Sequence, residues 1–244
     1  PQITFFKVVY RRHTNFSKEC IAQQFSGSAA FGSSVTCTLA RNGDLVQEIY
    51  LRAVLKCTVA ENNDVFRLDD VTSLIKTVEV EIGGQKIDKH YSQWLDIYNE
   101  LFETSHDYRA VMNSGSGKIA TAADDSKNIT AYIPLRFWFN RNPGLALPLI
   151  ALQYHEVKIN VTLGNNSDLR AALATAGGGT TVLNQLPGAV TVAPTNEVAA
   201  GGDESSDVAG RVGVALSSAD LLVNYLYLDT DERRRFAQVS HEYL

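Results

Sequence analysis

Several residue types are scarce in this chain of 244 residues, and each shortage excludes a class of protein. The three cysteines contain no Cys-x-x-Cys pair, which excludes a disulfide framework and a zinc ribbon. The longest weakly polar run, residues 143–152, holds two prolines and has about half of the ~20 residues that a membrane-spanning helix needs. Lys and Arg number 22 against 27 Asp and Glu, and this net charge of −5 disfavours a protein that coats nucleic acid.

Patterns that carry catalysis are also missing. The glycine-rich residues 114–118 lack the spacing and the final Ser or Thr of a phosphate-binding loop, and no serine stands in Gly-x-Ser-x-Gly. No two of the five histidines are two or four positions apart, as metal-binding pairs on a strand or helix would be. His155 falls on the apolar phase of a strand pattern, so a packed histidine is expected there. We therefore predict no enzyme, no catalytic, cofactor-binding or metal-binding residues, and no cofactor.

What the chain does have is alternation of apolar and polar residues with a period of two. This pattern predicts strands that bury one face. A further segment, residues 221–228, is apolar on both faces and is typical of a central strand. The alternating segments are residues 35–39, 49–59, 78–82, 129–139 and 157–163. Because no alternating strand–helix units occur, the pattern favours an all-β antiparallel sandwich.

One hairpin and one helix are marked locally. Gly83-Gly84 lies between two strand-like runs and suits a tight turn that needs positive φ. Residues 92–104 then change to a helical period, with Trp94, Tyr98 and Leu101 on one stripe that we expect to face the core.

Residues 164–219 form a Gly/Ala-rich stretch of fifty-six residues without an aromatic. We interpret it as a long surface loop inserted between two strands of one sheet system, and an interdomain linker is the competing interpretation. Its acids Asp203, Glu204 and Asp207 are the feature that a sugar-binding loop would need, although no aromatic accompanies them.

Charge is unevenly placed at the start of the chain. Residues 1–18 contain Lys7, Arg11, Arg12 and Lys18 but no acid, which is typical either of a solvated strand end or of a segment that faces an anionic surface. A second basic run, Arg233–Arg235, follows three acids and predicts a solvated turn.

Glycosylation is the one surface modification for which the sequence offers candidates. Asn128 and Asn165 begin Asn-x-Ser/Thr sequons and are candidates for glycosylation. Against modification, Cys37 and Cys57 fall on apolar strand phases and predict buried free thiols, which suit assembly in a reducing compartment.

Five stretches of the sequence, called strings here, carry more specific information than composition and periodicity. Residues 1–16, 41–45, 81–94, 142–159 and 228–244 closely resemble the major capsid protein of large eukaryotic double-stranded DNA viruses, the relatives of chlorella viruses, iridoviruses and giant viruses. The strings include RNGDL, EIGGQKIDKHYSQW and LDTDERRRFAQVSHEYL, and they occur in the family's order along most of the chain.

This resemblance implies a fold and a role. It implies an antiparallel jelly roll with one or two short helices over residues 1–230, the first half of a double jelly roll, with residues 231–244 starting the connection into a second jelly roll. The chain is then expected to be a piece of a longer protein that forms trimeric, pseudo-hexagonal capsomers of an icosahedral shell. A lectin-like, carbohydrate-binding jelly roll is the alternative.

The resemblance also implies partners and a place. They are a homotrimer with neighbouring capsomers, minor capsid proteins and the inner viral membrane, which the basic segment would face; no direct contact with nucleic acid is expected. The protein would lie in the virion and be assembled in the host cytoplasm.

Overall fold

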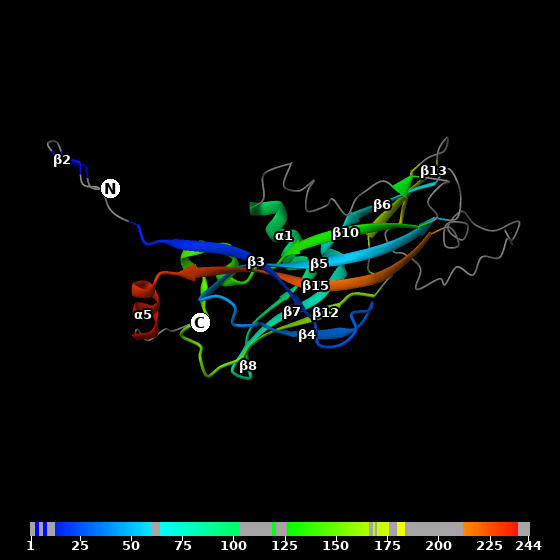
Figure 1. The fold of residues 1–244 in the computed structure, drawn as a ribbon. Helices are drawn as coiled ribbons and strands as arrows, with labels where there is room; N and C mark the ends of the chain where they lie inside the picture. Colours follow the sequence, from blue (N-terminus) through cyan, green and yellow to red (C-terminus); the bar gives the residue numbers. More distant parts are fainter. Residues whose placement is uncertain are drawn as a thin grey trace, which may run out of the picture.

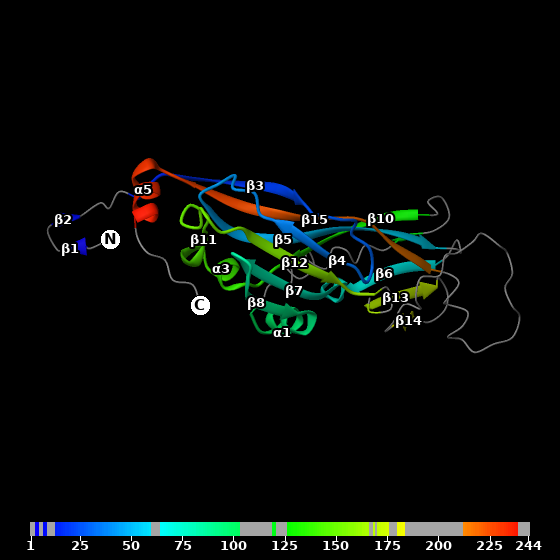
Figure 2. The ribbon, with the colours of Figure 1, turned by 90° about the horizontal axis from the view of Figure 1, so that it is seen from below.

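The computed structural model describes residues 3–4, 7–8, 13–59, 64–102, 119–120, 126–165, 168, 170–175, 180–183 and 212–238. Strands that pack as two facing sheets dominate this part of the chain, so the all-β prediction is confirmed. Figure 1 and Figure 2 show the strands running along the length of the molecule, with helix α5 (Thr230–Gln238) at one end and strand β13 (Arg170–Thr175) at the other.

The first sheet has the strand order β10–β5–β15–β3, and all neighbours are antiparallel. Its strands are β3 (Phe16–Gln24), β5 (Leu45–Val59), β10 (Ser126–Pro134) and β15 (Val212–Leu228), and the short β11 (Leu147–Pro148) pairs with the start of β5. The central position predicted for residues 221–228 is confirmed, because β15 lies between β5 and β3.

The second sheet has the order β4–β12–β7–β8 and is also antiparallel. Its strands are β4 (Ser34–Thr38), β7 (Ile75–Ile82), β8 (Gln85–Tyr91) and β12 (Val157–Leu163). Among these eight strands the first pairs with the eighth, the second with the seventh, and the fourth with the fifth. This nesting of early with late strands is the arrangement of a jelly roll.

One core lies between the two sheets. The inward side chains of both are almost completely buried, as the period-two pattern predicts. They include Ile49, Leu51 and Val223 from the first sheet and Val80 and Ile159 from the second. Cys37 belongs to this core, where burial raises the pKa of its thiol to about 11, so it behaves as a small apolar side chain.

Local predictions around the hairpin hold. Gly83 and Gly84 connect β7 to β8 with φ of 58° and 84°. Helix α1 (Ser92–Phe102) follows β8 directly and buries Leu95, while Trp94 packs against the core. Leu101 departs from the predicted core stripe, because it is 67% exposed.

One predicted strand is longer than the observed one, and one histidine was assigned to a strand that does not include it. The pattern of residues 129–139 predicts one strand, but β10 ends at Pro134, and helix α3 (Trp138–Arg141) and the 3-10 turn η3 (Pro143–Leu145) follow. Phe137 and Phe139 are nevertheless buried. The apolar pattern of these residues therefore predicted their burial correctly but not their secondary structure. His155 was also misplaced, since it is exposed in the turn that precedes β12.

The long loop expected at residues 164–219 is corrected where the structure describes it. Strand β13 and strand β14 (Thr180–Leu183) lie inside it and join β6 (Asp64–Asp70) and the short β9 (Ile119–Ala120) in a further sheet. In addition, β15 begins at Val212 rather than at residue 221. Alanine and threonine give β13 and β14 little apolar contrast, so their strand character depends on the pairing of β13 with β6 and of β14 with β13. The loop acids at residues 203, 204 and 207 lie outside the described residues.

The remaining short elements are β1 (Ile3–Thr4), which pairs with β2 (Lys7–Val8), and the 3-10 turn η1 (Thr72–Leu74) before β7. Within the described residues, no helix combines the length and the apolar character that a bilayer crossing requires.

Candidate functional site

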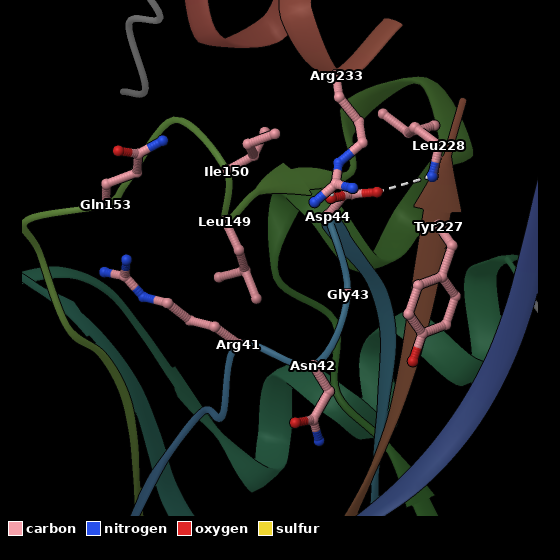
Figure 3. A pocket seen from close by; sticks show the side chains of 10 residues that line it. All are labelled: Arg41, Asn42, Gly43, Asp44, Leu149, Ile150, Gln153, Tyr227, Leu228 and Arg233. Atoms are coloured by element: carbon pink, nitrogen blue, oxygen red, sulfur yellow. Dashed lines mark hydrogen bonds and ion pairs between the residues drawn. The ribbon is translucent and has the colours of Figure 1, made fainter. Parts of the chain in front are cut away.

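A polar pocket of about 340 Å³ lies at the α5 end of the sandwich. Figure 3 shows that its lining comes from three parts of the chain, namely the loop before β5, the loop before β12 and the junction of β15 with α5. The ten lining residues are Arg41, Asn42, Gly43, Asp44, Leu149, Ile150, Gln153, Tyr227, Leu228 and Arg233.

Asp44 joins all three parts. Its side chain is 8% exposed, and its two carboxylate oxygens have different partners. Oδ2 accepts a hydrogen bond of 2.8 Å from the backbone N–H of Leu228, and Oδ1 lies 3.0 Å from Nε of Arg233 in α5 (Figure 3). The backbone of Asp44 donates to Leu226 and accepts from Ile150. The backbone N–H and the guanidinium compensate the charge of this buried carboxylate. Asp44 is therefore suited to holding the three chain segments together.

The loop before Asp44 is pressed against β15. A Cβ on Gly43 would lie 2.7 Å from Cβ of Tyr225, so the close approach requires glycine. The Tyr225 hydroxyl donates a 2.7 Å hydrogen bond to the carbonyl of Ala40. Burial raises the pKa of Tyr225 above its usual value, so this hydroxyl stays protonated and keeps donating.

The pocket wall opposite α5 is held by Arg41. Its Nη2 donates to the carbonyls of Leu152 and His155 at 2.5 Å and 3.1 Å, which orders the loop before β12. The pocket thus contains two guanidinium groups and one carboxylate that already has partners within the chain. These groups are suited to holding the surrounding chain segments in place. No group of three or more His, Cys, Asp or Glu residues that could hold a metal ion occurs among the described residues.

The residues predicted to form the basic segment are only partly described. Lys18 is exposed on β3, and Lys7 lies in β2 without a described side chain. Arg11 and Arg12 lie outside the described residues, so a joint basic surface of these four side chains stays a prediction.

The sequon residues are separated. Asn128 lies in β10, and its side chain is not described. Asn165 is exposed directly after β12, where its backbone N–H donates 2.8 Å to the carboxylate of Asp168. Glycosylation at either position stays a prediction.

Sequence reasoning missed the Asp44–Arg233 contact. The basic run was interpreted as a solvated turn, but it lies in α5, and Arg233 reaches back to the sandwich. The only signal in the sequence was that the strings RNGDL and LDTDERRR both belong to the family resemblance. Nothing local connects them, because the two partners are far apart in the chain.

The family model described as the N-terminus of the major capsid protein matches residues 4–229. The chain belongs to the major capsid protein family. The resemblance stated from the five strings is therefore confirmed.

Relatives of the capsid family match along the whole chain. The major capsid protein of Pyramimonas orientalis virus is 49% identical over 248 residues, which cover 100% of this chain and 52% of that protein. The major capsid protein of Paramecium bursaria Chlorella virus 1 is 40% identical, covering 100% of this chain and 47% of its own length. The chain spans about half the length of the curated relatives it matches.

Solved structures agree with the jelly roll. A quasi-atomic model of the PBCV-1 virus capsid is 37% identical with a TM-score of 0.65, over 98% of this chain and 49% of the other. The Faustovirus major capsid protein reaches the same TM-score of 0.65 at 12% identity, over 96% of this chain and 58% of the other, and so supports the fold alone. Homologues named as capsid proteins support a structural rather than an enzymatic role.

Proposed function

We propose that this chain is the amino-terminal jelly roll of a shell-forming protein whose full-length form makes trimeric, pseudo-hexagonal capsomers of an icosahedral virion. The observation that carries the proposal is the 49% identity to a viral major capsid protein along 100% of the chain. The strand order supports it, because two antiparallel sheets around one core make a stiff wall, while loops at the ends vary freely.

The proposal includes further partners and a location. Neighbouring capsomers and minor capsid proteins contact the jelly roll in the virion, and the protein is assembled in the host cytoplasm. The basic segment with Lys7, Arg11, Arg12 and Lys18 faces the inner viral membrane. Its support is charge, because residues 1–18 contain no acid in a chain of net charge −5. No direct contact with nucleic acid is part of this function.

The test is the mass of the protein at the full length that its gene encodes. Multi-angle light scattering after size exclusion should give three times the mass of one chain, without added ligand. Addition of calcium or of a panel of sugars should leave that mass unchanged. A monomer, or a mass that changes with calcium or sugar, would contradict the capsomer and favour the carbohydrate-binding alternative.

A further inference from the structure

One dipeptide at the α5 end of the molecule is chemically labile. Asn42 is followed by Gly43, and the pair Asn-Gly occurs at no other place in the chain. Asparagine is thermally labile because the backbone nitrogen of the next residue can attack its side-chain carbonyl carbon. Glycine obstructs this attack least, since it has no Cβ. The sequence therefore makes Asn42 the asparagine most open to such an attack.

The structure leaves both reacting groups accessible. Asn42 is exposed, and neither its carboxamide nor the N–H of Gly43 has a hydrogen-bond partner among the described residues. The side-chain amides of Asn140, Asn160 and Asn224, in contrast, each donate a hydrogen bond. A carboxamide without such a bond can rotate toward the next nitrogen, and an N–H without an acceptor can lose its proton to hydroxide.

The charge of the surrounding pocket favours the reaction. Asn42 lines the pocket together with Arg41, Arg233 and Asp44, so the lining carries two guanidinium groups and one carboxylate (Figure 3). That carboxylate is already compensated by the N–H of Leu228 and by Arg233. The remaining positive charge stabilises the deprotonated nitrogen and the oxyanion that forms when this nitrogen attacks the carbonyl carbon.

We propose that Asn42 is a site of spontaneous covalent modification, at which deamidation converts the asparagine to aspartate or isoaspartate. The nitrogen of Gly43 loses its proton to hydroxide and forms a bond with Cγ of Asn42, and the side-chain amide takes a proton from water and leaves as ammonia. Water then opens the resulting succinimide ring at either of its carbonyls. The net reaction consumes water, releases ammonia and adds a negative charge to the pocket.

The two products differ in their effect on the fold. Aspartate leaves the backbone unchanged and balances the charge of the pocket. Isoaspartate lengthens the backbone by a carbon atom next to Gly43, where even an added Cβ would lie 2.7 Å from Cβ of Tyr225. The backbone N–H of Asp44, which follows directly, donates a hydrogen bond of 2.9 Å to Leu226. Because the longer backbone must displace these contacts, accumulated isoaspartate loosens the α5 end.

Peptide mapping by mass spectrometry tests the proposal on the folded, full-length protein after incubation at mildly alkaline pH. Trypsin releases residues 42–52, whose only asparagine is Asn42. The internal control is Asn142, which is also exposed but precedes Pro143, a residue without the attacking N–H. Deamidation at Asn42 should be at least about tenfold faster than at Asn142 and should accelerate as the pH rises, because more of the attacking nitrogen is deprotonated.

A second comparison tests the contribution of the pocket. Arg233→Gln removes a guanidinium from the lining and should slow deamidation at Asn42 by about two- to threefold, a modest change because the Arg233 side chain is 56% exposed. Arg234→Gln is the matched control, since it changes the net charge equally from an exposed position of α5 outside the lining. If Arg233 acted only by fixing the loop, its loss would speed the reaction, so the sign of the change separates the two roles.

Three results would overturn the proposal. The first is equal conversion of Asn42 and Asn142 in the folded protein. The second is conversion of Asn42 that becomes fast only after unfolding in urea, which would mean that the fold protects the site. The third is a rate at Asn42 that Arg233→Gln leaves unchanged or raises.

The melting temperature tests the structural consequence. During the same incubation the wild type should lose thermal stability as isoaspartate accumulates, whereas Asn42→Gln, which does not close the succinimide ring, should keep its melting temperature. An equal decline in both would refute the loosening of the α5 end by isoaspartate. None of these measurements depends on the mass of the oligomer, so the inference and the proposed function fail separately.

Discussion

At the scale of single residues, Asp44 is the side chain on which the α5 end of the molecule depends. It connects positions 184 residues apart through its bond to the N–H of Leu228, and it receives Arg233 from α5. The two contacts are expected to contribute differently to the free energy of unfolding. A buried carboxylate that accepts from a backbone N–H leaves an unsatisfied donor when removed, whereas the guanidinium of Arg233 is 56% exposed and is screened by water.

We therefore expect Asp44→Ala to lower the free energy of unfolding by about 2–3 kcal/mol, because the N–H of Leu228 loses a charged acceptor. Arg233→Ala should lower it by less than about 1 kcal/mol. Urea unfolding followed by circular dichroism measures both. Asp44→Asn should fall between them, since the amide oxygen still accepts from Leu228. Equal losses for Asp44→Ala and Arg233→Ala would mean that the ion pair, rather than the backbone contact, holds the loop.

At the scale of elements, the turn of the β7–β8 hairpin needs glycine for two reasons. One is the local backbone conformation, and the other is close packing against a distant loop. Both glycines have positive φ, but only Gly83 is crowded, since a Cβ there would lie 2.6 Å from Nδ1 of His155. Gly84 has no atom within 4 Å of the same point. A substitution at Gly84 thus reports the backbone conformation alone, whereas one at Gly83 also reports packing against the loop before β12.

Gly84→Ala should lower the free energy of unfolding by about 1 kcal/mol, the usual cost of a left-handed alanine. Gly83→Ala should cost more, because His155 must move. Combining Gly83→Ala with His155→Ala should return the loss to that of Gly84→Ala, as thermal or urea unfolding can measure. His155→Ala alone is the control and should be close to neutral, because His155 is exposed. A double variant as unstable as Gly83→Ala would show that the contact with His155 is not the cause.

At the scale of the whole molecule, the basic segment and the net charge have opposite signs. Screening limits the reach of a charge to about 8 Å at physiological salt, so an anionic surface close to residues 1–18 is attracted to that segment despite the net charge of −5. The contact expected with the inner membrane should therefore depend on local bases.

Replacement of Lys7, Arg11 and Arg12 by glutamine should abolish flotation of the full-length protein with vesicles that contain anionic lipid, and added salt should weaken binding of the wild type. The matched control replaces three exposed bases elsewhere, Lys56, Lys76 and Arg141, which changes the net charge equally. Loss of binding in both triple variants would mean that net charge, and not the segment, controls attachment.

The sequence by itself determined the local structure. Alternation marked the inward faces of β5, β7 and β12, the glycine pair marked the hairpin, and the change of period marked α1, because burial on one side of an element is written into its own residues. The five strings identified the family, although they carry no geometry. The candidate site was not predictable, since neither RNGDL nor the basic run shows its partner.

Only the tertiary structure decided which distant edges meet. It paired β3 with β15, turned part of the expected long loop into β13 and β14, ended β10 at Pro134 and brought Arg233 to Asp44. It also exposed Leu101, although its helical stripe predicted burial. The physical reason is the same in each case. Periodicity records that a side chain is apolar, but whether its neighbour is the core, another strand or a second molecule depends on contacts between residues far apart in the chain.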